Sequence, residues 1–162
     1  MTHGRFDRKK LQKVRDFIEA QGPESKIYVG CDSEAYKKGG KRMADYYLVV
    51  VIHINGRHGC KIFGDKITEP DFTVDRKKPS YRLMNEVYKV SELYLELADV
   101  IGDRECEIHL DINPNKKHAS SMVIEQAIGY VKGTCNVIPL VKPDSWCATH
   151  VADKFLKVAN GR

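Results

Sequence analysis

A ten-residue apolar run, Asp45–Ile54 (DYYLVVVIHI), constrains the fold most, because its apolar side chains fall on both faces of an extended chain. Such a strand must be covered on both sides, so we expect it inside a sheet that carries helices. Asn55 and Gly56 follow directly and are typical of a hairpin turn, which predicts a partner strand at Cys60–Ile67. Another strand is expected at Lys26–Cys31, and a polar, basic loop at Tyr36–Ala44 separates it from the central run.

Helices and strands alternate through the rest of the chain. The helix predicted at Ser80–Ile101 has the clearest pattern, a long apolar stripe at helical spacing. Pro139 should keep the last strand at an edge of the sheet. The order predicts an α/β fold: one mixed, five-stranded sheet with an antiparallel start, parallel crossovers and helices on its faces. Further helices are expected at Phe6–Ala20, Lys116–Val131 and Ser145–Val158, and further strands at Glu107–Leu110 and Asn136–Val141.

The composition is that of a folded chain. Its 162 residues are 42% apolar and 30% charged, which fits one domain and argues against disorder. We expect a single domain over residues 1–162, with residues 1–22 as an N-terminal helical extension. No apolar run approaches the roughly 20 residues of a membrane span, and the basic N-terminus lacks the apolar stretch of a secretory signal. The five cysteines stand singly, which favours buried, reduced thiols in a cytoplasmic protein.

Two apolar runs share a pattern, since each ends in an aspartate: Asp32 after YVGC and Asp111 after IHL. If the two strands are parallel neighbours, both carboxylates emerge at the same edge of the sheet. Like charges so placed repel each other, which raises their pKa values unless a cation neutralises them. Hard divalent cations such as Mg²⁺ take carboxylate oxygens and keep waters for a phosphate substrate. The pattern therefore indicates a cation site.

Two helical acids would complete this cluster. Glu86 lies at the border of an apolar stripe, and Asp153 lies among the apolar residues of the last helix. A charged side chain at the border of a core-facing stripe needs a partner or a metal. Each acid alone has an ordinary alternative: Asp32 and Asp111 as turn or cap residues, Glu86 as a solvated residue, and Asp153 as a surface or ion-pair residue. The prediction rests on the joint arrangement of the four.

The chain resembles the ribonuclease H-like superfamily, and within it the small bacterial and phage YkuK-type proteins. The resemblance spans Phe6 to Lys157 and is carried by IYVGCDSE (27–34), MNE (84–86), IHLDIN (108–113) and VKPDSWCATHVADKFLK (141–157). It implies a ribonuclease H-like fold with strand order 3-2-1-4-5 and strand 2 antiparallel. It also implies that Asp32, Glu86, Asp111 and Asp153 are catalytic carboxylates that hold two Mg²⁺ or Mn²⁺ ions. One ion would activate a water and the other would stabilise the leaving oxygen.

A divalent-metal-dependent nuclease acting on RNA, DNA or a hybrid is the function that this combination predicts. The alternative is a non-catalytic module on the same fold that binds nucleic acid or protein. The net charge of +5 leaves open a solubilising surface or a polyanion partner. If the partner is nucleic acid, the phosphate contacts are expected on basic loops flanking the site. These residues are Lys37, Lys38, Lys41, Arg42, Arg76, Lys77, Lys78 and Lys116.

Three further residues are accessory candidates. Asp144 would cap the last helix or serve as a metal ligand, and His150 would move a proton or be an ordinary surface histidine. Ser33 follows Asp32 directly, and it lacks the His–Asp partnership of a serine hydrolase.

Two other chemistries are disfavoured. A zinc site made of His109, Asp111 and His118 has no recognised spacing. Neither GxxxxGK[ST] nor GxGxxG is present, which argues against nucleotide binding through a phosphate loop.

Overall fold

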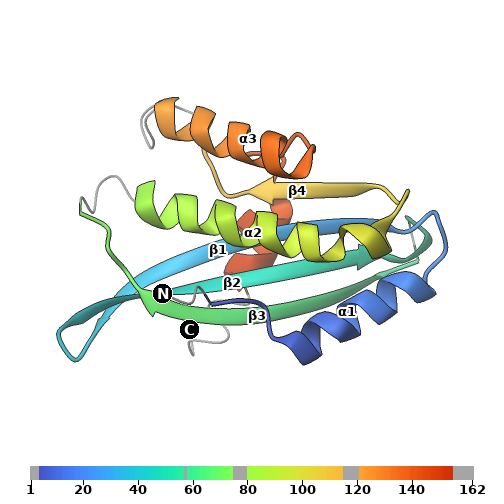
Figure 1. The fold of residues 1–162 in the computed structure, drawn as a ribbon, viewed down its shortest axis with the longest axis horizontal. Coiled ribbons are helices and arrows are strands. Elements are labelled where there is room, and N and C mark those ends of the chain that lie inside the picture. The colour runs from blue at the N-terminus through green and yellow to red at the C-terminus, as the bar shows by residue number, and fades with distance from the viewer. Residues whose placement is uncertain (1–3, 57, 75–79, 115–120, 155–162) are drawn as a thin grey trace.

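A four-stranded mixed sheet forms the centre of the molecule in a computed structural model that describes residues 4–56, 58–74, 80–114 and 121–154 (Figure 1). The strand order is β3-β2-β1-β4, where β1 is Lys26–Lys38, β2 is Lys41–His53, β3 is Cys60–Pro70 and β4 is Cys106–Leu110. Strands β1, β2 and β3 pair antiparallel, and β4 runs parallel to β1. The antiparallel start and the parallel crossover were both predicted.

Helices cover the two faces of this sheet unequally. Helices α1 (Arg8–Ala20), α2 (Ser80–Ile101) and α3 (Ser121–Cys135) contribute to one core, together with side chains such as Ile27 and Val29 of β1. The opposite face, carrying Tyr28, packs against a short π-helical segment, η2 (Cys147–Ala152). Because neighbouring residues of a strand point to opposite faces, the central strands need apolar residues on both, as the run at Asp45–Ile54 predicted.

The predicted fifth strand is not a strand in the structure. Within Asn136–Val141, the sheet-like pairing of the described residues is an isolated parallel bridge between His109 and Leu140. The Leu140 amide donates to the Ile108 carbonyl, and the Leu110 amide donates to the Leu140 carbonyl, both at 2.9 Å. Pro139 has no amide hydrogen, so it cannot extend a ladder of such bonds. The segment therefore lies beside β4, where the fifth strand was expected, but it pairs with β4 through an isolated bridge and does not form a strand.

The predicted loop at Tyr36–Ala44 is also wrong, because β1 and β2 continue through it as a hairpin. The ladder runs to a final pair between Lys38 and Lys41. Gly39 and Gly40 form the turn with φ values of 59° and 77°, the left-handed region that a tight two-residue hairpin turn requires. This hairpin extends beyond the rest of the sheet (Figure 1). We call residues 36–43 the arm.

The predicted bounds of the helices agree best with the structure where the apolar stripe is long. Helix α2 covers the predicted range Ser80–Ile101, and α1 begins two residues later than predicted, after the Asp7 side chain accepts a bond from the Lys10 amide. Helix α3 continues to Cys135, four residues past its predicted end. Residues 116–120 and 155–158 of the predicted helices lie outside the described residues.

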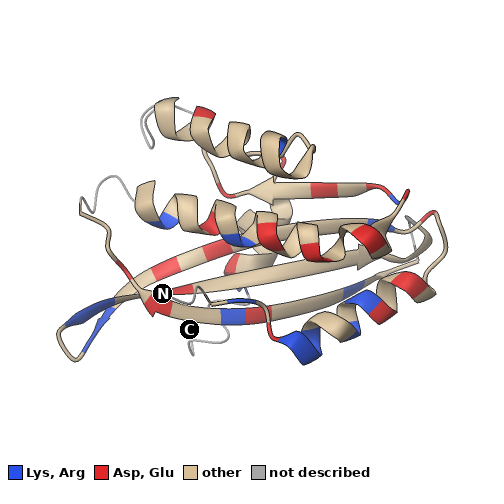
Figure 2. Cartoon of the chain, viewed as in Figure 1, with Lys and Arg blue, Asp and Glu red and all other residues tan. Residues whose placement is uncertain are grey.

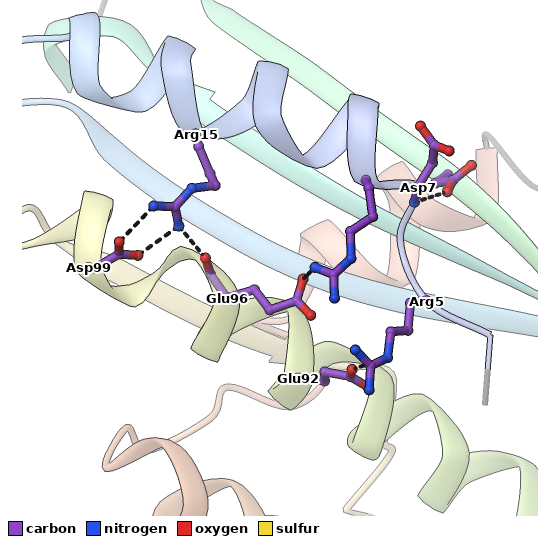
Figure 3. Close-up of polar contacts among 8 residues, drawn as sticks. Arg5, Asp7, Arg15, Glu92, Glu96 and Asp99 are labelled. Carbon is purple, nitrogen blue, oxygen red and sulfur yellow. Dashed lines mark hydrogen bonds and ion pairs between the residues drawn. The ribbon is translucent and has the colours of Figure 1, made fainter. Parts of the chain in front are cut away.

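Ion pairs hold α1 against α2. Arg5, Arg8 and Arg15 pair with Glu92, Glu96 and Asp99, at 3.0, 3.2 and 2.6 Å respectively (Figure 3). The three acids lie at intervals of four and three residues, so they share one side of α2. Arg15 also donates to the backbone carbonyl of Glu96. The N-terminal helix is thus attached through charged contacts as well as through its apolar stripe.

All five cysteines carry free thiols, as predicted, and Cys31, Cys135 and Cys147 are buried. Cys60 is exposed, contrary to the expectation of burial, because it begins the edge strand β3. None of the helices in the described part of the chain combines the length and the apolar character needed to cross a membrane.

Candidate metal centre

Three elements bring acidic residues together at the edge of the sheet. Asp32 lies on β1, one residue beyond the last pair of the β1–β4 ladder, Cys31 with Leu110. Asp111 directly follows β4, so it emerges next to Asp32. Glu86 comes from α2, which covers the sheet at this point. Because β1 continues to Lys38, Asp32 marks the end of the parallel ladder and not the end of its strand.

Oxygen atoms of these three carboxylates all lie within 4.8 Å of one another. Asp32 and Glu86 are only 9% and 8% exposed, so water neutralises little of their charge. The Glu86 Oε1 atom is buried and has no hydrogen-bond partner among the described residues. A buried carboxylate oxygen without a hydrogen-bond partner, in a residue that lies beside two other carboxylates, is a costly arrangement unless a cation completes it.

Electrostatics points the same way. Burial raises the pKa of Asp32 to about 8, with further contributions from the nearby Asp111 and Asp153 charges. Burial and the Asp32 charge raise the pKa of Glu86 well above its usual range. Both shifts reflect carboxylates that are unstable as a bare anionic cluster, and a divalent cation would remove this penalty.

Hydroxyl groups orient two of the three acids. The Ser33 hydroxyl donates to Glu86 Oε2 at 2.7 Å, and the Ser33 amide donates to Asp32 Oδ1 at 2.8 Å. The Thr149 hydroxyl donates to Asp111 Oδ1 at 3.2 Å. Ser33 was an accessory candidate, and the structure places it in hydrogen-bond contact with the site.

A lysine also reaches the cluster. Lys142 Nζ lies 3.1 Å from Asp111 Oδ1, and 39% of the Lys142 side chain is exposed. The Lys142 amide donates to the Ile112 carbonyl, which continues the bonding that begins at the Leu140 bridge. The positive charge is therefore built into the edge of the site and remains accessible to a ligand.

Close packing of η2 against β1 places the last acidic residue. A Cβ atom on Gly30 would come within 2.8 Å of the Ala148 backbone nitrogen, so only glycine admits this approach. Asp153 follows η2 as its C-terminal cap residue and lies close enough for its charge to raise the pKa of Asp32. It lies outside the 4.8 Å group formed by the other three acids.

Comparison with models of protein families assigns the chain to one family. The family model described as Ribonuclease H-like matches residues 9–157, which includes the three elements that carry the acidic group. The chain belongs to the ribonuclease H-like family. Searches of curated proteins and of solved structures gave no significant match.

Of the remaining predicted residues of this ribonuclease H-like chain, the described ones are not members of the acidic group. Asp144 and His150 are exposed, and η2 has no side-chain cap, so Asp144 does not cap it. Lys37, Lys38 and Lys41 are exposed on the arm. Arg42 pairs with the buried Asp71 at 3.4 Å. Arg76, Lys77, Lys78 and Lys116 lie outside the described residues.

His109 has a structural role instead of the zinc ligation considered above. It is fully buried, and its Nδ1 accepts the backbone N–H of Cys147 at 3.1 Å. Its Nε2 lies 3.3 Å from Glu107 Oε2, and burial lowers the pKa of the imidazole. The neutral ring therefore ties the start of η2 to β4. His118 lies outside the described residues.

The sequence did not predict the contacts that three residues make in or near the ribonuclease H-like site. These residues are Lys142, Thr149 and His109. Lys142 and Thr149 lie in the block 141–157, whose Lys-Pro-x-Ser-Trp-x-Ala pattern already carried the resemblance. His109 lies two residues before Asp111 in an apolar strand, where a polar ring needs a partner. The block 141–157 and the polar ring in an apolar strand therefore marked these residues as unusual, but neither feature identifies the residue that each side chain contacts.

Proposed function

We propose that this ribonuclease H-like chain is a divalent-metal-dependent nuclease that hydrolyses phosphodiester bonds by two-metal-ion catalysis. The observation that carries the proposal is the group formed by Asp32, Glu86 and Asp111 at the sheet edge. Family membership indicates the reaction class, and the acidic group supplies residues suited to it.

The donor set fits Mg²⁺ or Mn²⁺. It consists of carboxylate oxygens alone, the ligands preferred by hard cations, and one of its residues, Glu86, also has a buried oxygen without a hydrogen-bond partner among the described residues. Asp32, Glu86 and Asp111 would hold the ions, with Asp153 as the proposed fourth carboxylate. When bound, divalent ions supply a nucleophile from water at neutral pH and offset charge on the leaving oxygen.

The residues around the acids support this chemistry. Ser33 and Thr149 each donate one hydrogen bond to a carboxylate, which fixes its rotamer before a ligand arrives. Lys142 supplies an accessible ammonium beside Asp111, where it would contact a phosphate oxygen of the substrate. His150, exposed on η2, is proposed as an accessory group that moves a proton, and Asp144 as an auxiliary acid.

Basic residues would hold the rest of the nucleic acid through its phosphates, and most of this binding would be sensitive to salt. Of these, the exposed arm lysines Lys37, Lys38 and Lys41 are accessible, whereas Arg42 is occupied with Asp71. The proposed set also includes Arg76, Lys77, Lys78 and Lys116.

A panel of labelled RNA, DNA, duplex DNA and RNA–DNA hybrid, incubated with Mn²⁺ or Mg²⁺, tests the proposal. We expect cleavage of at least one substrate that EDTA abolishes. Asp111→Asn should reduce the rate at least about a hundredfold, because it removes the negative charge of one of the three proposed ligands in the group. Asp103→Asn, which alters an exposed acid outside the site, is the matched control.

Calorimetric titration with Mn²⁺ separates binding from catalysis. Wild-type protein should bind the ion, and Asp111→Asn should bind it at least about tenfold more weakly. Full cleavage by Asp111→Asn would overturn the mechanism. Nucleic-acid binding without cleavage at saturating Mn²⁺ would instead support a non-catalytic module on the same fold.

A further inference from the structure

The arm carries opposed like charges that do not stabilise the sheet. Its last two pairs set like charges directly opposite each other, Lys37 with Arg42 and Lys38 with Lys41. Like charges at such positions destabilise a β-ladder. Strand β3 ends at Pro70, which lies opposite Met43 of β2, so the two like-charge pairs beyond Met43 belong to a two-stranded ribbon. Figure 2 shows the resulting basic tip projecting from the sheet.

The register relates this tip to the acidic group. Alternate residues of a strand share a face, so Lys38 lies on the same face of β1 as Asp32. Lys41, directly opposite Lys38, shares that face as well. Lys37 and Arg42 belong to the other face, and Arg42 is paired with Asp71. Lys38 and Lys41 are thus the two exposed charges of the arm that share the face of Asp32.

One edge of β1 is open between these two places. Pairing with β4 ends at Cys31, and beyond it β1 has a strand partner on the β2 side alone, among the residues that the structure describes. Lys38 lies six positions beyond Asp32 along β1, and at about 3.3 Å per residue this spacing is about 20 Å. A nucleic-acid strand with about 3.4 Å between stacked nucleotides would cover this distance in about six nucleotides.

We propose that Lys38 and Lys41 form a remote phosphate clamp that binds the substrate strand about six nucleotides from the bond cleaved at Asp32, Glu86 and Asp111. This inference rests on the proposed function and adds a substrate class, nucleic acids long enough to extend from the metal centre to the arm. Lys38 and Lys41 lie opposite each other on one face, so a phosphate bound between them would relieve the repulsion that the ladder imposes.

The test compares Lys38→Gln/Lys41→Gln with Lys9→Gln/Lys13→Gln, which removes two equally exposed charges from α1. The probes are labelled 20-nucleotide RNA and DNA strands and trinucleotides of the same bases, which are too short to reach the arm. For the cleaved 20-mer, the arm variant should lower kcat/KM roughly ten- to thirtyfold at about 0.15 M salt, with kcat unchanged. The trinucleotide should be cleaved equally by all three proteins.

Binding of the 20-mers in EDTA, where no metal-dependent cleavage occurs, gives an independent reading. The slope of log Kd against log salt concentration should fall by about 1.4 in the arm variant, about 0.7 for each lost contact with a single strand, and stay unchanged in the α1 variant. The melting temperature of the arm variant should equal or exceed that of the wild type, because a like-charge pair has been removed.

Each other outcome has a distinct meaning. Equal losses on the 20-mer and the trinucleotide would overturn the clamp, since the lysines would then act at the metal centre. An unchanged salt slope would overturn it as well. A reduced slope in a protein that cleaves none of these strands would support phosphate binding by the two lysines, while the nuclease would be decided by the panel that includes duplex DNA and hybrid. Absence of binding to every probe would overturn the clamp.

Discussion

Lys142 places a positive charge 3.1 Å from a carboxylate that we propose as a metal ligand. The ammonium and a divalent cation would compete for the same Asp111 oxygen. An ion pair that is partly exposed contributes at most about 1 kcal/mol, or about a fivefold change in an equilibrium constant. The metal-free site is therefore partly neutralised by the chain itself.

Lys142→Met should bind Mn²⁺ up to about fivefold more tightly than the wild type while cleaving nucleic acid more slowly, because competition and a phosphate contact are lost together. Titration calorimetry measures the first effect and steady-state kinetics the second. Lys142→Arg, which keeps the charge, is the control. Weaker Mn²⁺ binding by Lys142→Met would show that the lysine supports the metal site instead of opposing it.

Asp32 makes the stability of the metal-free protein dependent on pH. Its pKa is about 8 in the folded protein against 3.8 as the ordinary value, so the folded state favours the protonated acid. This contribution is complete below pH 3.8 and is lost as the pH rises through about 8. The raised pKa of Glu86 acts in the same direction.

We expect the free energy of unfolding of EDTA-treated protein to fall by at least about 2 kcal/mol between about pH 5 and pH 8, since each pKa unit corresponds to about 1.4 kcal/mol. Asp32→Asn removes this titrating carboxyl and should lose its share of the dependence, while the share of Glu86 remains. Urea titrations across this range provide the measurement, and the exposed Asp103→Asn provides the control. A wild-type curve parallel to that of Asp32→Asn would contradict the pKa shift.

At the scale of elements, Gly30 determines how closely η2 approaches the sheet. Substitution by alanine would force its Cβ against the Ala148 backbone, which cannot move aside as a flexible side chain can. Gly30→Ala should therefore destabilise the fold by about 1–3 kcal/mol. Gly129→Ala in α3, where no atom lies within 4 Å of a new Cβ, should stabilise it by roughly 0.5–1 kcal/mol.

Chemical denaturation of both glycine variants gives the comparison directly. Because η2 carries Thr149 and leads into Asp153, Gly30→Ala should also weaken Mn²⁺ binding, whereas Gly129→Ala should leave it unchanged. If the two substitutions changed the free energy of unfolding equally, the backbone near Gly30 would be able to shift away from the new Cβ without loss of stability.

Elements with long, regular patterns were predictable from the sequence. The apolar stripe of α2 runs through the whole helix, and its predicted bounds match the structure. The arm was missed because the polar residues Lys37 to Arg42 suggest a loop, while their strand conformation depends on pairing with each other. The fifth strand failed because Pro139 limits it to a bridge, a distinction that apolar character alone does not make.

The candidate site was predictable to a similar extent. Asp32 and Asp111 were linked by their places after two apolar runs, and the structure brings them together with Glu86. The partners Lys142 and Thr149 could not be assigned, because their contacts with Asp111 depend on the path of the chain between Leu140 and η2. Sequence spacing identifies which groups share an element, whereas contacts between elements follow from packing.

For the molecule as a whole, the charged contacts between α1 and α2 connect its first helix to the elements of the site. Arg15 binds both oxygens of Asp99 and holds the pKa of that acid at about 2, well below its ordinary value. A lowered acid pKa stabilises the fold above the ordinary value of 3.8 and ceases to do so as the pH falls through about 2.

Asp99→Asn should lower the melting temperature by a few degrees at neutral pH, and the difference from the wild type should shrink as the pH falls below 3.8. Arg15→Gln and the double variant complete a thermodynamic cycle, which isolates the energy of this pair from other effects of each substitution. A difference that persists undiminished at the acid end would assign the loss to packing of α1 instead of to the charge.

Within the part of the chain that the structure describes, β1 has no strand partner on its β4 side beyond Cys31, and this edge also bears on how copies of the chain behave at high concentration. Unpaired strand edges are templates for pairing with other chains, and lysines near such an edge oppose that pairing because two copies repel each other. Lys37 and Lys38 stand at the end of this edge. The charges that we propose for substrate binding would therefore also oppose edge-to-edge aggregation of the molecule, and so would serve both solubility and recognition.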